Sequence, residues 1–279
     1  MLNFGYRFAR IHGAAVRAAY AAALPYLPEP VVRNSAPLPF EVYTYSGEAA
    51  LPEQIAAIRS LLRYAGQPKK ITIVSDGSHP ARSLELLRRL DPHLVIAQAS
   101  DFVPADLPTR LHAYLTGHPT GKQLAVMMAL PVNGPALYLD SDVLFFPGAH
   151  ALASELFASE GPAAFLADCQ LSADERMFRD PVEGANPVNA GFVFWREKLN
   201  WASSLERFLE LPGDPIFFTN QTLTHLAMHE NEARPLDPRK FLLQLDDQFS
   251  YGDFHKNPER IMRHYVNPVR HKFWTALCS

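Results

Sequence analysis

Hydrophobic and polar residues follow two alternating spacings along the chain after residue 40. Residues 40–45 alternate as a β-strand does, and Pro52 then opens a segment in which Ile55, Ile58 and Leu62 share one helical face until Gly66. The same succession predicts strands at 70–75, 94–97 and 136–139, and helices at 80–90 and 122–130. Strands that alternate with helices predict an α/β fold, in which helices flank a mostly parallel sheet.

The first 39 residues differ from the rest of the chain. Five prolines between residues 25 and 39 break any helix there and indicate a linker, so we expect a single folded domain at 40–279. Residues 1–28 contain Arg7, Arg10 and Arg17 among aromatic and aliphatic residues, and no acidic one. This basic, amphipathic pattern is typical of a helix packed on the domain, of a targeting segment, or of a helix at a membrane surface. Under the last interpretation, residues 1–30 make a peripheral membrane contact.

Composition changes this picture in three respects. The 26 basic and 29 acidic side chains leave a net charge of −3, which provides no general attraction for nucleic acid. Cys169 and Cys278 lie far apart in sequence, which fits a reducing, cytoplasmic setting better than a disulfide scaffold. No apolar run reaches the roughly eighteen residues that a membrane span requires. We therefore expect a cytoplasmic protein without nucleic acid partners, either free of the membrane or peripheral at its inner face.

The predicted strand at 136–139 leads into two carboxylates, Asp140 and Asp142, with apolar residues on both sides. Residues two apart in extended backbone point to the same side, so both carboxylates face one point beyond the carboxyl end of the strand, where parallel sheets bind ligands. Two like charges beside an apolar segment need a compensating cation, and hard divalent ions prefer carboxylate oxygen. The pattern therefore predicts a metal site. The alternative is a solvated turn in which one of the two caps the next helix.

Two other motifs would use the same carboxylates. Residues 117–123 are similar to a phosphate-binding P-loop, but the spacing is one residue short and Gln123 replaces the Ser or Thr that would bind magnesium. Asp140 and Asp142 would also serve as nucleophile and acid of a haloacid-dehalogenase-like phosphatase. That motif places Thr or Val at the position of Leu144 and lies on the first strand, whereas three predicted strands come earlier here. Both alternatives are disfavoured.

Five segments share their order and spacing with the motifs of a known family: residues 74–78 (Val-Ser-Asp-Gly-Ser), 138–144 (Tyr-Leu-Asp-Ser-Asp-Val-Leu), 189–194 (Asn-Ala-Gly-Phe-Val-Phe), 218–221 (Phe-Thr-Asn-Gln) and 264–274. They resemble the second-strand loop, the Asp-x-Asp motif, the Asn-Ala-Gly strand, the Asp-Gln pair and the C-terminal His-x-x-Gly-x-x-Lys-Pro-Trp of GT-A-fold glycosyltransferases. The best match is the retaining family 8 group, which includes glycogenin and lipopolysaccharide galactosyltransferases. Asn220, Asn267 and Arg270 replace the family's Asp, Gly and Lys, so the chain resembles a distant member.

The resemblance implies a GT-A, Rossmann-like fold over about residues 40–274 and roles for individual residues. Asp140, Asp142 and His264 would bind the metal, with His271 as the substitute for His264. The other implied contacts are with the diphosphate (Lys122, Arg270 and Lys272), the nucleotide base and the second-strand loop (Tyr43, Thr44, Tyr45 and Asp76), the sugar hydroxyls (Asp168 and Asn189) and the reacting centre (Asn220 and Gln221). Gln221 cannot act as a base, which fits retention of configuration. Each of these residues also has a simpler interpretation as an ordinary helix, strand or turn residue.

These expectations describe a manganese- or magnesium-dependent glycosyltransferase. It would transfer a sugar with retention from a nucleotide-diphosphate sugar, UDP rather than GDP, to a saccharide, lipid-linked or protein acceptor. Two other functions stay open. One is a metal-dependent phosphatase or nucleotidase that uses Asp140 and Asp142. The other is a catalytically silent sugar-nucleotide-binding protein, an alternative that Asn220 supports.

Overall fold

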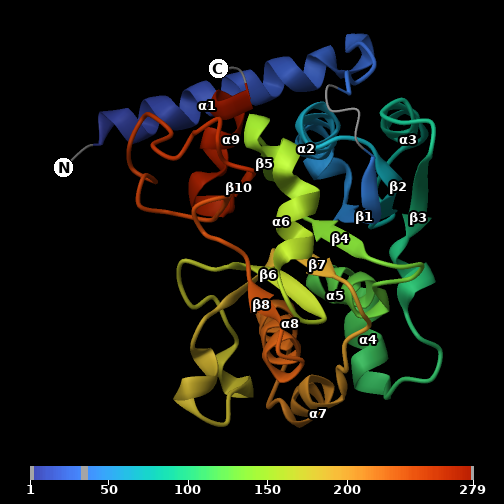
Figure 1. Cartoon of the computed structure of the whole chain (residues 1–279). Helices are drawn as coiled ribbons and strands as arrows, with labels where there is room; N and C mark the ends of the chain where they lie inside the picture. Colours follow the sequence, from blue (N-terminus) through green and yellow to red (C-terminus); the bar gives the residue numbers. More distant parts are fainter. Residues whose placement is uncertain (1–2, 33–36, 278–279) are drawn as a thin grey trace.

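A seven-stranded sheet forms the centre of the molecule (Figure 1). The computed structural model describes residues 3–32 and 37–277, so Cys278 lies outside the described part. Within these ranges the strand order is β3–β2–β1–β4–β7–β6–β8. The bounds are β1 (Leu38–Ser46), β2 (Pro68–Ser75), β3 (Leu94–Gln98), β4 (Ala136–Leu139), β6 (Ala163–Ala167), β7 (Val188–Trp195) and β8 (Arg234–Pro235). The first four neighbours are parallel, and β7 runs antiparallel to both β4 and β6. The predicted α/β fold with a mostly parallel sheet is confirmed.

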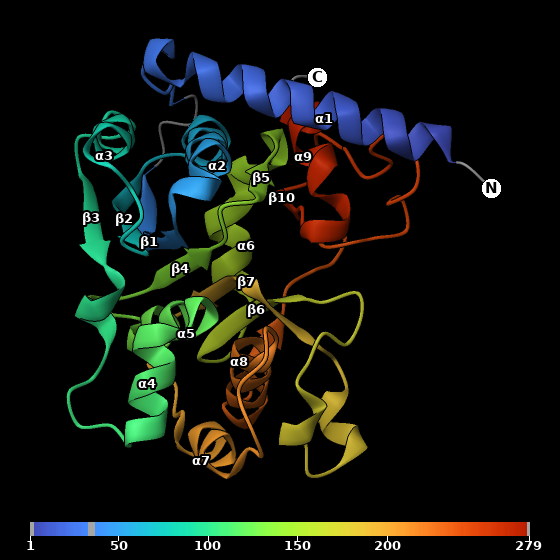
Figure 2. The same ribbon diagram turned by 180° about the vertical axis from the view of Figure 1, so that it is seen from behind.

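Helices cover both faces of this sheet, and strand alternation produces two separate cores. Leu137 and Leu139 of β4 pack into one core, while Tyr138 between them packs into the other, as a period of two requires. The first core contains α2 (Leu51–Tyr64), α3 (Ala81–Arg88) and α6 (Leu152–Ala158). The second contains α4 (Thr109–Gly117), α5 (Pro119–Ala129), α7 (Ala202–Glu210) and α8 (Thr219–Glu230). Figure 2 shows the second group from behind.

The predicted elements up to residue 139 are present, with ends that differ by a few residues. The segment before Lys122 is the helix α4, which ends at Gly117, and α5 begins two residues later. A P-loop requires a strand at this position, so the structure excludes that interpretation. Asp140 follows the fourth strand of the chain, whereas the haloacid-dehalogenase motif lies on the first strand, so the structure disfavours that interpretation as well.

A second, smaller sheet brings the end of the chain to the centre. Its strands, β5 (Val143–Phe145), β10 (Met262–His264) and β9 (Phe241–Leu242), are too short to be predicted from sequence. β10 pairs antiparallel with β5, with His264 opposite Val143. This register places His264 beside Asp142, although 122 residues separate them in sequence.

The N-terminal helix α1 (Phe4–Ala23) packs on α9 (Arg270–Leu277) and α2, and lies across one end of the molecule in both views (Figures 1 and 2). Ala9 and Gly13 face α9, and a Cβ atom at Gly13 would lie only 2.3 Å from the carbonyl oxygen of His271. Arg17 forms an ion pair of 2.5 Å with the buried Glu53 of α2. No helix within residues 3–32 and 37–277 is long and apolar enough to cross a membrane.

Candidate active site

The carboxylates of Asp140 and Asp142 meet the imidazole of His264 at the carboxyl end of β4. The backbone fixes both acids, because the Asp140 amide donates to the Gly191 carbonyl (2.8 Å) and the Tyr265 amide donates to the Asp142 carbonyl (2.9 Å). The His264 Nε2 atom lies 2.9 Å from Asp142 Oδ1 and 3.7 Å from Asp140 Oδ2. One ligand atom from each of the three residues lies within 4.8 Å of the others.

The surroundings of His264 fit a metal ligand. Asp168 Oδ2 can only accept, so the Asn189 amide nitrogen faces it (3.2 Å) and the Asn189 carbonyl oxygen faces His264 Nδ1 (2.9 Å). Nδ1 therefore carries the proton, and Nε2 is the nitrogen turned toward the two carboxylates. A second hydrogen bond that fixes the ring and its tautomer is usual for metal-binding histidines. Two carboxylates and one imidazole are donors that suit Mn²⁺, and the oxygens suit Mg²⁺.

Positive side chains balance these carboxylates. Burial raises the pKa of Asp140. Burial alone would also raise the pKa of Asp142, but His264 and Arg270 lower it to about 2. Arg270 contributes a fork of two hydrogen bonds to Asp142 Oδ2, at 2.5 and 3.1 Å. A half-exposed guanidinium next to the carboxylates is well suited to receive phosphate, which it binds with the same bidentate geometry.

Gly191 of β7 leaves space for two of the three candidate ligands, His264 and Asp140. A Cβ atom there would lie 2.2 Å from His264 Cε1 and 2.6 Å from Asp140 Oδ2. This close approach is the physical reason for glycine in the Asn-Ala-Gly segment.

Gly191→Ala is expected to displace His264 and Asp140, because the added methyl group would collide with both. The metal would then lose the position of two of its ligands, and manganese-linked nucleotide binding should weaken by roughly tenfold or more. Isothermal titration with Mn²⁺ and UDP measures this. Gly117→Ala is the matched control, because nothing lies within 4 Å of a Cβ atom at that position, and it should bind as the parent chain does. Equal affinity of the two variants would contradict the proposed crowding.

A pocket of about 300 Å³ opens in front of the three residues. Four of the predicted catalytic residues line it, namely Asp168, Asn189, Asn220 and Gln221. Gln221, on the first turn of α8, donates to Asp168 Oδ2 (3.1 Å) and to the Ser172 carbonyl (2.9 Å). Asp168 thus accepts from both Asn189 and Gln221, which ties the end of β6 to β7 and α8. The structure brings these four residues together with Asp140, Asp142, His264 and Arg270.

Sequence reasoning missed Gln123, which connects Asn220 to Asp140. The Gln123 amide nitrogen donates to Asp140 Oδ1 (2.9 Å) and to the Tyr138 hydroxyl (2.9 Å), and the Asn220 amide donates to the Gln123 carbonyl (2.9 Å). The Tyr138 hydroxyl itself donates to Asp140. Because a carboxylate accepts only, the orientation of Gln123 follows from Asp140, and a donor is required at position 220. The available signal was a polar residue that opens the apolar run 124–130 of a helix.

Gln123→Leu is expected to lower the Mn²⁺ affinity by about tenfold, because it removes one donor from Asp140 and leaves the Asn220 amide unpaired. Gln123→Glu should lower it further, since a carboxylate then opposes Asp140 at hydrogen-bond distance. Manganese titration monitored by nucleotide binding compares the three chains. An unchanged affinity in Gln123→Leu would show that Gln123 does not support the ligand.

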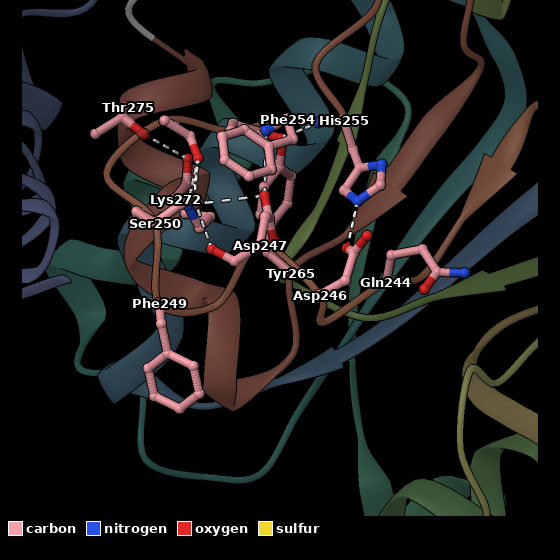
Figure 3. Close-up of polar contacts among 12 residues, drawn as sticks. Gln244, Asp246, Asp247, Phe249, Ser250, Phe254, His255, Tyr265, Lys272 and Thr275 are labelled. Carbon is pink, nitrogen blue, oxygen red and sulfur yellow. Dashed lines mark hydrogen bonds and ion pairs between the residues drawn. The ribbon is translucent and has the colours of Figure 1, made fainter. Parts of the chain in front are cut away.

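The structure does not bring Lys272 or His271 to this pocket. The Lys272 ammonium is buried and donates to Ser250 Oγ (3.0 Å) and to the Gly252 carbonyl (Figure 3). The same nitrogen lies 3.7 Å from Asp247 Oδ2. The His271 ring lies beside Tyr6 of α1, 5.5 Å between centroids, and burial lowers its pKa to about 4. Both residues belong to α9, where positions 271 and 272 are rotated by roughly 100° and 200° from Arg270. Only Arg270 of the three reaches Asp142.

The remaining predicted nucleotide contacts lie at the ends of β1 and β2. Thr44 faces α2, where its hydroxyl donates to Gln54 (2.9 Å), and the Tyr43 hydroxyl donates to Glu41 (2.6 Å). Tyr45 is half-buried close to Asp76, whose charge adds to burial in raising the Tyr45 pKa. The Lys122 ammonium donates to the Asp76 carbonyl (3.3 Å). Tyr45, Asp76 and Lys122 therefore come together, whereas Tyr43 and Thr44 are turned into the two cores.

A buried ionic cluster around Asp247 holds the loop 246–256 against β10 and α9. Arg263 of β10 donates twice to Asp247, at 2.8 and 3.0 Å, and also contacts Asp253. The Tyr265 hydroxyl donates to Asp253 (2.7 Å). Asp246, Asp247 and His255 also have ligand atoms close together, but Arg263 and Lys272 already neutralise Asp247. This cluster is therefore a structural element rather than a second metal site.

Three solved structures show the same fold. Mouse xyloside xylosyltransferase 1 in its apo form matches with a TM-score of 0.54 and 13% identity, over 84% of this chain and 99% of that chain. The galactosyltransferase LgtC in complex with donor and acceptor sugar analogues matches with a TM-score of 0.55 and 12% identity, over 86% and 95%. The bifunctional glycosyltransferase WbbM in its apo form matches with a TM-score of 0.58 and 14% identity, over 90% and 50%.

No family model and no curated protein sequence matches the chain. The likeness therefore lies in the structure, at an identity that shows the fold alone. The chain has the GT-A fold of these glycosyltransferases, as its motifs predicted.

Proposed function

We propose that the chain is a metal-dependent glycosyltransferase that uses a nucleotide-diphosphate sugar, with UDP as the favoured nucleotide. The observation that carries this proposal is the convergence of Asp140, Asp142 and His264 with Arg270 at the wall of one pocket in a GT-A fold. Mn²⁺ or Mg²⁺ held by the first three residues would supply positive charge to the leaving diphosphate. Localisation in the cytoplasm and a saccharide, lipid-linked or protein acceptor belong to the same proposal.

Different residues of the chain would then bind the diphosphate, the nucleoside and the sugar. Arg270 binds the diphosphate through its guanidinium fork and stabilises the negative charge that grows when the glycosyl–oxygen bond breaks. Tyr45, Asp76 and Lys122, which come together beyond the ends of β1 and β2, would contact the nucleoside. Asp168 and Asn189 bind sugar hydroxyls with their acceptor and donor groups, and Gln123 with Asn220 holds Asp140 in place.

Gln221 is the residue that favours retention of configuration at the anomeric carbon. An inverting enzyme needs a carboxylate base at the acceptor, and Gln221, an amide, is held by Asp168 and Ser172 at the pocket wall. It stabilises positive charge at the anomeric carbon through its carbonyl oxygen. The acceptor hydroxyl proton passes to the leaving phosphate oxygen as the new glycosidic bond forms, which retains configuration.

Two alternatives remain as outcomes of the test. A phosphatase or nucleotidase needs a free carboxylate nucleophile, whereas Asp140 accepts from Gln123 and Tyr138 and Asp142 is paired with His264 and Arg270. A silent binding protein would keep the pocket but lack turnover, and Asn220 in place of the family's Asp is the feature that favours it.

A thermal-shift panel of UDP, GDP, ADP and CDP, each with Mn²⁺ and with EDTA, tests the donor first, because a ligand that binds only the folded state raises the melting temperature. We expect the largest shift with UDP and Mn²⁺ and a much smaller one with EDTA. Slow hydrolysis of UDP-sugars, with the released sugar keeping its anomeric configuration by NMR, then tests turnover. Release of phosphate from simple phosphoesters would favour the phosphatase, and UDP-sugar binding without turnover would favour the silent protein.

A further inference from the structure

Helix α1 packs on the domain with one face and exposes a second apolar face. The packed face includes the small residues Ala9 and Gly13, the larger Val16 and Tyr20, and Arg17, which is paired with Glu53. On the outer face, Phe4, Phe8 and Ile11 recur at the spacing of one helical stripe, and each is more than half exposed. Packing on the domain therefore does not use up the apolar surface of this helix.

The loop 246–256 packs beside α1 and exposes two more aromatic side chains. The Asn3 amide donates to the Phe249 carbonyl (2.8 Å), and the Phe249 ring lies 5.4 Å from that of Tyr6. The Tyr251 hydroxyl is hydrogen-bonded to His12 (3.0 Å). Phe249 and Tyr251 are nevertheless more than half exposed themselves. Phe4, Phe8, Ile11, Phe249 and Tyr251 are called the aromatic rim below.

Hydrogen bonds hold the loop that carries two of the five residues of the aromatic rim. Lys272 of α9 donates to the carbonyls of Ser250 and Gly252, and Ser250 Oγ donates to the Asp247 carbonyl (2.8 Å). Figure 3 shows Phe249 pointing away from this cluster, while Lys272, Ser250 and Asp247 point toward one another. The buried charges thus fix the loop backbone, and the aromatic side chains project from a preorganised surface rather than from a flexible one.

Positive charge accompanies the aromatic rim. Residues 4–23 contain no acidic side chain, and within the described part of the chain neither Arg7 nor Arg10 forms an ion pair. Arg7 and Arg10 are exposed on the turns that carry Phe4, Phe8 and Ile11. The turns of α1 from Phe4 to Ile11 therefore expose large apolar side chains together with two arginines.

We propose that the aromatic rim, with Arg7 and Arg10, docks the protein on the surface of an anionic lipid bilayer. Aromatic residues mixed with arginine suit the boundary between headgroups and acyl chains, where rings partition and guanidinium groups meet lipid phosphate. Helix α1 lies at one end of the molecule in both views (Figures 1 and 2), and each of the five rim residues is more than half exposed, so an extended surface can reach them. This inference goes beyond the proposed activity and does not depend on it, since no residue of the rim lines the pocket.

Cosedimentation with vesicles tests the proposal on the full chain. We expect the protein to pellet with phosphatidylglycerol–phosphatidylcholine vesicles at low salt, and less with pure phosphatidylcholine. Phe8→Ser/Phe249→Ser should lower the partition coefficient by at least about tenfold, because two aromatic rings no longer leave water. Arg7→Gln/Arg10→Gln should lower it by roughly tenfold on anionic vesicles only, and salt should have the same effect.

Val182→Ser is the matched control, an exposed apolar residue in the connection between β6 and β7, at the other end of the molecule from α1 (Figure 1). It should pellet like the parent chain, and all variants should keep the same melting temperature and the same affinity for UDP with Mn²⁺. No pelleting of the parent chain at low salt, or equal pelleting of the Phe8→Ser/Phe249→Ser variant, would overturn the proposal. So would a dimer in sedimentation velocity that this variant dissociates, since the rim would then bind a second copy.

Discussion

Asp142→Asn is expected to abolish manganese-dependent nucleotide binding and to reduce glycosyl transfer by about two to three orders of magnitude or more, the usual cost of losing charge stabilisation in a transition state. Asp142 offers one oxygen to the metal position beside His264 and the other to Arg270. An amide supplies no negative charge, so both the metal and the phosphate-binding guanidinium lose their anchor.

The comparison requires a readout of folding, because Asp142 also pairs with the buried His264 and with Arg270. Circular dichroism melting of the variant shows how much folded protein is present, and binding is normalised to it. Asp106→Asn serves as the control, since Asp106 is an exposed carboxylate outside the pocket. If Asp142→Asn kept a melting shift with UDP that still required Mn²⁺, the ligand assignment would be wrong.

Arg263→Met should be the most destabilising single change outside the pocket, with a loss of about 3–5 kcal/mol in the free energy of unfolding. Arg263 is fully buried, as is Asp247, to which it donates twice. Its removal leaves Lys272 near Asp247 and the Tyr265 hydroxyl on Asp253, together with hydrogen bonds from the backbone amides of Phe254 and His255. The cost reflects an uncompensated buried charge, not the net contribution of the ion pair.

Urea denaturation measures this loss, with the slope m compared between variants to verify that the same transition is observed. Arg239→Ala is the control, because the Arg239 side chain is 88% exposed and its ion pair with Asp237 should contribute less than about 1 kcal/mol. Equal stability of the two variants would mean that the cluster around Asp247 is not needed for folding.

The first half of the fold could be predicted from sequence because each helix and strand there has its own local sequence pattern. Strands β1, β2 and β4 are apolar runs with polar ends, and α2 has a proline at its start and a glycine just beyond its end. The Asp140–Asp142 pair was visible for the same reason, since both residues follow a buried strand directly.

The rest of the site depends on pairing between distant segments. His264 reaches Asp142 only through the antiparallel register of β10 on β5, which neither three-residue strand encodes by itself. Lys272 was assigned to the phosphates because the segment after 264 was compared as a motif. A helix separates Arg270 from Lys272 by more than half a turn, so one residue enters the pocket and the other the buried cluster. The role of Gln123 could not be predicted from sequence, because it depends on a hydrogen-bond donor at position 220, on another helix.

The contact between α1 and α9 joins residues near 13 with residues near 271, so closing it requires nearly the whole chain to be ordered first. Long-range contacts of this kind form late in folding and open early, since their loop-closure entropy is recovered last. Hydrogen exchange in the native protein should therefore find α1 less protected than β1 or β4. Because α9 carries Arg270, each excursion of α1 would also loosen the arginine that faces the carboxylates, and the fraction of time that α1 stays closed would set the fraction of molecules with a complete site.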